Sequence, residues 1–210
     1  MIKIFVPYDD REKVEQLGAI KSKSPFYLVP DSKDIFTFAY WNRPAIHPVI
    51  NGEDRTFGNN WLYVDLIPST CWYTNVRSNI DSVDWERLKE MCRQRARYCC
   101  EICGATSDYS QQQYLECHER YLFDKNTKMQ KIIRFMCICS MCHKVSHFGL
   151  SQVQGKSEEA LQHLMKVNRW DKYRARKHVD KRFQLWEMKS DMDWVLDLSL
   201  LDSIGIKQVE

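Results

Sequence analysis

Two cysteine pairs constrain this 210-residue chain more than any other feature of its sequence. The first pair is Cys100 and Cys103, and after 35 intervening residues the second pair is Cys139 and Cys142. Each C-x-x-C pair can place two thiolates about 2.3 Å from a tetrahedral zinc ion. Gly104, directly after the first pair, permits the tight turn that such a knuckle needs. The spacing therefore predicts a structural Zn²⁺ held by these four cysteines.

The remaining cysteines bear on the choice of ligands. Cys99 and Cys137 sit beside the pairs and could compete as ligands, but only the choice above gives both pairs a two-residue gap. Cys71 and Cys92 are expected in the core. Because the first residues lack the apolar core and cleavage site of a secretory signal, a disulfide framework is improbable and we expect a cytoplasmic protein. No run of about 18 apolar residues occurs, so we expect no membrane partner.

The first 45 residues predict a small β-α-β unit. A strand from Ile2 to Val6 precedes a helix from Asp9 to Leu17 that ends at Gly18, and a second strand covers Phe26 to Val29. Such a unit is too small to bury much core alone. Residues 46–80 are expected to form a connector with strand content at 61–64.

Residues 81–155 predict an α+β domain around the cysteine pairs. A helix is expected from Ser82 or Asp84, either of which could cap it, through Arg97. Two strands follow at 114–123 and 129–135, and helix signals resume after Cys139. The expected order is therefore strand, turn, strand and helix, with zinc at its ends.

Three histidines form a second candidate cluster. His143 and His147 are four residues apart, which places both imidazoles on one face of a helix. His118, on the preceding strand, can complete a three-ligand site with an open position. Phosphodiester cleavage needs a base to deprotonate water and a divalent ion to offset phosphate charge, and such a site can supply both.

Residues 84–150 carry a pattern seen in a known family. The first cysteine pair is followed by Leu115-Glu116-Cys117-His118-Glu119, and the second pair by His143 and His147. This pattern resembles the four-cysteine zinc branch of the HNH, or ββα-metal, endonucleases. His147-Phe148-Gly149, Gly155 and Val167-Asn168-Arg169-Trp170 are similar to a phage and plasmid subgroup of that family. The resemblance implies a DNA-cleaving hydrolase whose catalytic ion (Mg²⁺, Mn²⁺, Ni²⁺ or Zn²⁺) is held by His118, His143 and His147.

Two alignments with the family motif assign the catalytic roles differently. If Leu115 and Glu116 stay in register, His118 is a metal ligand and Glu119 takes the place of the general base. If His118 is instead the base, Cys117 takes the ligand position. We prefer the first because the Leu-Glu pair sets the strand alternation. The resemblance thus implies catalytic roles for His118, Glu119 and His143.

The family's asparagine has no clear equivalent, although Gln130 and Asn168 could supply an amide.

The N-terminal unit resembles another family. Phe5-Val6-Pro7, Leu17-Gly18-Ala19 and Tyr27-Leu28-Val29-Pro30 are similar to the short DUF5710 module attached to plasmid conjugation primases. The resemblance implies an accessory, nucleic-acid-facing role.

Residues 156–210 predict a C-terminal extension of helices and a final strand. Helices are expected from Ser157 to Val167 and from Lys172 to Met188, and the strand, at 194–201, is expected to pair with the connector or the N-terminal unit. His163 and His178 are expected to be exposed. The net charge is only +3, but the segment from Lys166 to Arg182 contains eight basic residues and only two acidic ones. Such a helix suits a DNA backbone, and the candidate DNA contacts are Arg93, Arg97, Arg174, Lys177 and Lys181.

Two functions follow from these patterns. The first is an HNH-type endonuclease that hydrolyses DNA, duplex or nicked and branched, in a phage, plasmid or defence context, with a protein partner that targets it. The second is a catalytically degenerate, zinc-stabilised module that binds nucleic acid or protein. The retained pair of His143 and His147 favours the first function, whereas Glu119 and the missing asparagine favour the second.

Overall fold

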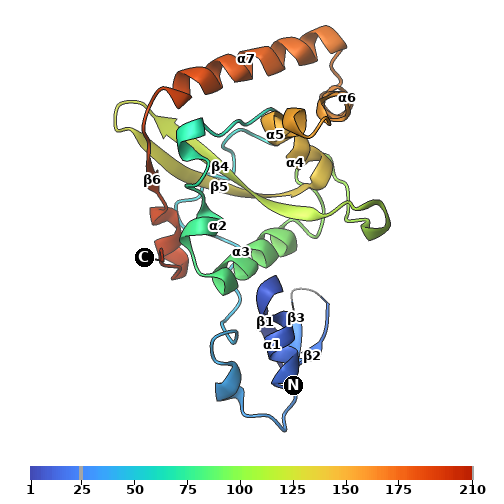
Figure 1. The fold of residues 1–210 in the computed structure, drawn as a ribbon, viewed down its shortest axis with the longest axis vertical. Coiled ribbons are helices and arrows are strands. Elements are labelled where there is room, and N and C mark those ends of the chain that lie inside the picture. The colour runs from blue at the N-terminus through green and yellow to red at the C-terminus, as the bar shows by residue number, and fades with distance from the viewer. Residues whose placement is uncertain (24–25, 210) are drawn as a thin grey trace.

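Two small sheets organise the α+β fold in the computed structural model, which describes residues 1–23 and 26–209 (Figure 1). The first sheet has the antiparallel order β1-β3-β2. Its strands are β1 (Ile2–Phe5), β2 (Ile20–Lys21) and β3 (Phe26–Val29). Helix α1 (Arg11–Gln16) follows β1, and Gly18 takes a φ of +95° just after it, a conformation that favours glycine. The predicted unit is confirmed, with the short strand β2 added.

A separate small core holds this N-terminal unit. Ile4, Val14 and Trp41 are buried within it, and Val83 of helix α3 (Ser82–Arg95) completes it. The Tyr40 hydroxyl also donates a hydrogen bond to Asp81 Oδ2 at 2.9 Å. Because a unit of this size cannot bury enough apolar surface alone, it uses the following domain as part of its core.

The second sheet is built on a long hairpin. Strand β4 (Leu115–Asp124) pairs antiparallel with β5 (Met129–Cys139), with a bulge at Arg120/Tyr121. The short strand β6 (Val195–Asp197) pairs parallel with β5, so the expectation that it pairs with the connector or N-terminal unit was wrong. β4 covers only one edge of β5, which leaves the other edge for β6. The chain then turns into a 3-10 helix at Ser199–Ile204 rather than continuing the strand.

Helices lie on both sides of this hairpin (Figure 1). On one side are α2 (Val76–Asn79) and α3 (Ser82–Arg95). On the other are α4 (Ser140–Ser146), α5 (Phe148–Val153), α6 (Ser157–Asn168) and α7 (Lys172–Ser190). Among the described residues, no helix combines the length and the apolar composition that crossing a bilayer requires.

Helix α3 begins at Ser82, one of the two predicted positions, but its capping residue and its end differ from the prediction. Asp81, rather than Ser82 or Asp84, caps it by accepting a hydrogen bond from the Val83 amide. Asp84 is buried and pairs with Arg87 and Arg43 instead. The helix ends before Arg97 because Arg97 and Tyr98 both take positive φ angles.

The connector contains no strand at 61–64, which corrects the prediction. Its backbone groups bond to side chains of distant helices instead of to a neighbouring strand. The Val64 amide donates to His178 Nε2 at 3.1 Å, and Asn168 Nδ2 donates to the Leu62 carbonyl at 2.6 Å. Arg182 Nε donates to the Val64 carbonyl. An extended segment is therefore held between the hairpin and the C-terminal helices. The other 3-10 helices cover Tyr8–Asp10, Ile35–Phe38, Ser69–Cys71 and Tyr109–Gln111.

Candidate metal centre

The four paired cysteines converge at one end of the hairpin. Their sulfur atoms all lie within 4.8 Å of one another, which is close enough to hold one metal ion. Leu115 pairs with Cys139 in the register of β4 and β5, so the second knuckle begins where the hairpin ends. In the first knuckle, the Cys103 amide donates to Cys100 Sγ at 3.5 Å, and Gly104 takes a φ of +77°. Hydrogen bonds among the four thiols lower the pKa of Cys103 and raise the pKa values of Cys139 and Cys142. Thiolates are the form that binds zinc.

The competing cysteines lie outside this cluster. Cys137 is fully buried in β5, and its sulfur atom is not among those that converge. Cys99 Sγ instead donates to the Arg97 carbonyl at 3.5 Å. The four-cysteine set is therefore the one whose chemistry fits a zinc ion.

His163 is not an exposed helix residue, contrary to the prediction. Its Nε2 lies 3.3 Å from Cys142 Sγ, on the side of α6 that packs against α4. An N–H donated to a thiolate stabilises its negative charge. His163 has no ligand spacing in the sequence, so no local signal marked this contact.

Three histidines converge on the face of the hairpin that α4 covers. The ligand atoms of His118, His143 and His147 lie within 4.8 Å of one another. His118 comes from β4, whereas the other two are joined by the amide of His147, which donates to the His143 carbonyl at 2.9 Å. The sequence spacing predicted this group, and it is close enough to hold a metal ion.

His118 provides the test of whether a metal ion fits. Its side chain is 3% exposed, and its Nε2 is buried with no hydrogen-bond partner among the described residues. An unsatisfied buried nitrogen is costly, and a metal ion would satisfy it. Burial lowers the pKa of both His118 and His147, which favours the neutral imidazole that binds metal. The three residues fit a divalent ion.

Two carboxylates flank the histidines. Glu116 Oε2 lies 3.1 Å from His143 Nδ1, and Asp65 Oδ2 lies 3.9 Å from His118 Nε2. Arg182 Nη2 of α7 approaches Asp65 Oδ1 at 3.6 Å. Burial alone would raise the pKa of each carboxyl, but the polar neighbours outweigh it and lower both pKa values. These neighbours are chiefly His143 for Glu116, and His118 with Arg182 and Arg120 for Asp65. Both groups are therefore carboxylates at neutral pH.

Glu119 and Cys117 do not join the histidines. Successive strand residues point to opposite faces of a sheet, and these two side chains lie on the face opposite His118. Glu119 accepts hydrogen bonds from the Val76 amide at 3.1 Å and the Tyr121 hydroxyl at 3.0 Å. Burial raises its pKa to about 7. Cys117 Sγ lies 3.1 Å from Cys92 Sγ.

Neither amide considered as a replacement for the motif asparagine reaches the histidines. Gln130 is fully buried, and its Nε2 donates to the Thr74 carbonyl at 3.1 Å. Asn168 is bonded to the connector at Leu62, as described above.

The candidate DNA contacts fall into two groups on opposite sides of the hairpin (Figure 1). Three of them are exposed on α7: Arg174, Lys177 and Lys181. Arg97 is exposed just after α3, and Arg93 is half-buried, with its Nε donating to the Leu115 carbonyl at 3.2 Å. The structure therefore does not gather all five into one surface.

His178, the other histidine expected to be exposed, faces inward from α7. Besides accepting from the Val64 amide, it packs against Trp170 with ring centroids 5.2 Å apart. Burial, followed by the charges of Arg182 and Lys181, lowers its pKa to about 4.

Sequence reasoning missed Asp65 and the contact of Glu116 with His143. Asp65 follows an apolar run in the connector, and no motif or spacing links it to the histidines. Glu116 was used only to align the strand, although its place two residues before His118 puts both on one strand face.

Comparisons with known proteins add no relative: no protein-family model, curated protein or solved structure matches this chain. The functional argument therefore rests on the chemistry of the two clusters.

Proposed function

We propose that this protein is a metal-dependent endonuclease of the HNH type that hydrolyses phosphodiester bonds in DNA. The observation that carries the proposal is the buried, unpartnered Nε2 of His118, which converges with His143 and His147. A hairpin followed by a helix, with histidines on both, is the arrangement that the resemblance of residues 84–150 implies. The exposed basic residues of α7 support DNA as the substrate.

The four-cysteine cluster is assigned a structural zinc ion. Three of the four ligands, Cys100, Cys139 and Cys142, are buried, and Cys103 is partly buried. The cluster therefore has little access to solvent. Closed tetrahedral sets of four thiolates are typical of structural zinc sites. This ion would hold the ends of the hairpin and the start of α4 in place.

The three-histidine cluster is assigned the catalytic divalent ion, held by His118, His143 and His147. When bound, that ion would offset negative charge on the scissile phosphate and on the leaving oxygen. Glu116 accepts a hydrogen bond from Nδ1 of His143, which directs the other ring nitrogen into the cluster.

Asp65 is assigned the role of general base, which accepts a proton from the attacking water. Its Oδ2 is 3.9 Å from His118 Nε2, too far for a direct hydrogen bond, and Arg182 holds the other carboxylate oxygen. An ionised carboxylate at the edge of the cluster can accept a proton from water. Glu119, on the opposite face, is left without this role.

Plasmid cleavage tests the proposal. Supercoiled plasmid is incubated with the protein in Mg²⁺, Mn²⁺, Ni²⁺ or EDTA, and nicked and linear products are measured on a gel. We expect metal-dependent nicking that falls at least about 100-fold in His118→Ala. His47→Ala removes an exposed histidine from the connector and serves as the matched control. Equal activity of the two variants would contradict the assigned site.

A second candidate function is a zinc-stabilised binding module that does not cleave. The positions of Glu119 and Gln130, both bonded elsewhere, favour it. In that case no metal supports cleavage, while wild type and His118→Ala retard DNA equally on a gel.

A further inference from the structure

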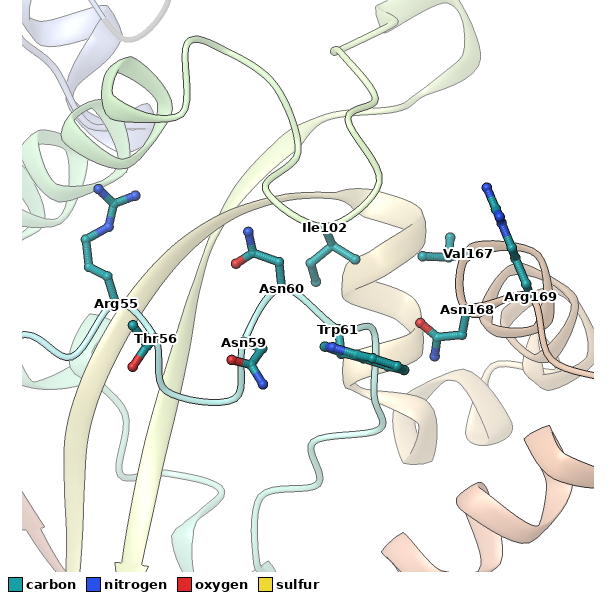
Figure 2. A pocket seen from close by; sticks show the side chains of 9 residues that line it. All are labelled: Arg55, Thr56, Asn59, Asn60, Trp61, Ile102, Val167, Asn168 and Arg169. Carbon is teal, nitrogen blue, oxygen red and sulfur yellow. The ribbon is translucent and has the colours of Figure 1, made fainter.

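A pocket of about 770 Å³, lined mostly by polar and charged residues, lies beside the first cysteine pair and outside both clusters. The loop at 55–61 forms one wall, and residues 167–169 at the end of α6 form the other. Figure 2 shows Ile102, from within the first cysteine pair, projecting between Asn60 and Val167. A pocket of this size is within the range that binds a small molecule or one unit of a polymer.

Two buried arginines hold the loop that forms the first wall. Arg120 Nη1 donates to the Asn59 carbonyl at 2.7 Å, and its Nη2 donates to the Trp61 carbonyl at 3.2 Å. Arg134 donates to the same Asn59 carbonyl at 2.9 Å and to Asn60 Oδ1 at 2.8 Å. Neither arginine is more than 2% exposed. Buried charges are costly, and here the contacts that they make determine the shape of the pocket wall before any ligand arrives.

The groups that this wall presents fit a nucleotide. Trp61 is 55% exposed, and Figure 2 shows its indole ring lying across the pocket. Aromatic faces of this kind are platforms on which bases stack. The amide oxygen of Asn168 lies on the side of Trp61 in Figure 2, while its Nδ2 donates to the Leu62 carbonyl. Amides beside a stacking platform can bond to the edge of an unpaired base.

Guanidinium groups stand at the two ends of the pocket. Figure 2 shows Arg55 at one end and Arg169 at the other. Arg55 is half exposed and pairs with Glu101 at 3.1 Å, and Arg169 is exposed. A strand with one base against Trp61 carries phosphates in both directions along its backbone, and arginine is well suited to bind phosphate.

We propose that this pocket binds one unpaired nucleotide of a DNA strand, with its base on Trp61 and its base edge at Asn168, while neighbouring phosphates of the same strand lie at Arg55 and Arg169. Trp61 and Asp65 are four residues apart, so their Cα atoms lie within about 14 Å of each other. That span corresponds to about four nucleotide steps of a B-form strand. The identification of the bound strand as the substrate rests on the proposed function, and it favours nicked or branched DNA with unpaired bases near the cleaved bond. Binding itself requires no cleavage.

Fluorescence anisotropy with a labelled oligothymidylate of about ten nucleotides tests the pocket in full-length protein without added divalent ion. We expect Trp61→Ala to weaken binding by about 5- to 150-fold. Trp61→Phe, which keeps a stacking face, should restore most of the affinity. The matched control is Trp72→Ala, because Trp72 is 59% exposed and lies outside the pocket. Melting curves and zinc content establish that each variant is folded.

Three results would overturn the proposal. The first is that Trp61→Ala and Trp72→Ala bind the oligothymidylate with equal affinity. The second is that Trp61→Ala loses as much affinity for a blunt duplex as for the oligothymidylate. The third is that the protein binds polyglutamate in a Trp61-dependent way but does not bind the oligonucleotide. His118→Ala should bind the oligonucleotide like wild type. If plasmid cleavage fails while Trp61 still determines binding, the proposed function falls and the pocket stands. If cleavage occurs while Trp61→Ala binds normally, the pocket proposal falls alone.

Discussion

The four-cysteine cluster and the three-histidine cluster share one hairpin but have different surroundings. The cysteine ligands come from two short knuckles and lie mostly buried, with His163 as the nearby donor. The histidine cluster combines a 3% exposed His118 with a 30% exposed His143, and two carboxylates flank it. Closed sites with thiolate ligands stabilise structure, whereas sites with an exposed side leave room for a substrate. The comparison therefore favours a structural role for the cysteine cluster and a substrate-binding role for the histidine cluster.

The sequence order connects the clusters. Cys142 and His143 are neighbours on α4, yet one points to the cysteines and the other to the histidines. The cysteine cluster thus positions the helix that carries two of the three histidines. Loss of the cysteine cluster should disrupt both sites, while loss of a histidine should affect only its own.

The largest effect is expected from Cys139→Ala. Zinc sites of this type contribute about 10–16 kcal/mol in small zinc domains, as much as the whole stability of most domains. We expect the variant to lose zinc and cooperative thermal unfolding, as measured by metal content and circular dichroism. Cys99→Ser, beside the first knuckle but outside the cluster, should stay folded. A Cys139→Ala protein that melts like wild type would refute the structural role.

Asp65→Asn should mainly affect chemistry. We expect cleavage to fall about 10²- to 10⁴-fold, because the amide cannot accept the water proton. Calorimetric titration with Mn²⁺ should show affinity within about twofold of wild type, as expected for a residue outside the ligand set. A parallel loss of Mn²⁺ affinity would make Asp65 a ligand instead.

Glu116→Gln should weaken the histidine cluster without unfolding the chain. Carboxylates that orient a metal-binding histidine typically contribute about 10- to 100-fold in metal affinity, and we expect a loss of that size for Mn²⁺ in titration calorimetry. Glu159→Gln removes the Lys144 ion pair on the same side of the molecule and is the control. If both substitutions leave affinity unchanged, His143 is not oriented by Glu116.

The smallest effect concerns pH and the connector that carries Asp65. The pKa of His178 is about 4, below its unfolded value near 6.5. Its contribution is therefore present above pH 6.5 and lost as pH falls toward 4, because the unfolded chain binds the proton more readily. After allowance for solvent screening, we expect the loss to be about 1–2 kcal/mol.

Urea unfolding at several pH values between 7 and 4 measures this effect. His178→Gln keeps an acceptor for the Val64 amide but cannot titrate, so its stability should fall less over this range. Parallel pH profiles for the two proteins would show that His178 does not contribute.

Local patterns in the sequence predicted much of the fold and both clusters. The two-residue gaps in the cysteine pairs, the alternation of β4 and the spacing of His143 and His147 act over a few residues, so they could be recognised without a structure. Strand β3 follows its prediction at both ends. Periodicity of this kind reports local geometry, and the metal ligands depend on it.

Contacts between distant segments decided the rest. The apolar run at 61–64 has the composition of a strand, but its backbone bonds to His178, Asn168 and Arg182, more than 100 residues away. Those bonds bring Asp65 to the histidines and Trp61 to the pocket. Similarly, His163 and His178 point inward because their contacts, with Cys142 and Val64, come from distant parts of the chain. The sequence alone determined which side chains can bind metal, because ligand spacing is local. Only the tertiary structure decided which carboxylates accompany them, because their partners come from segments far apart in the chain.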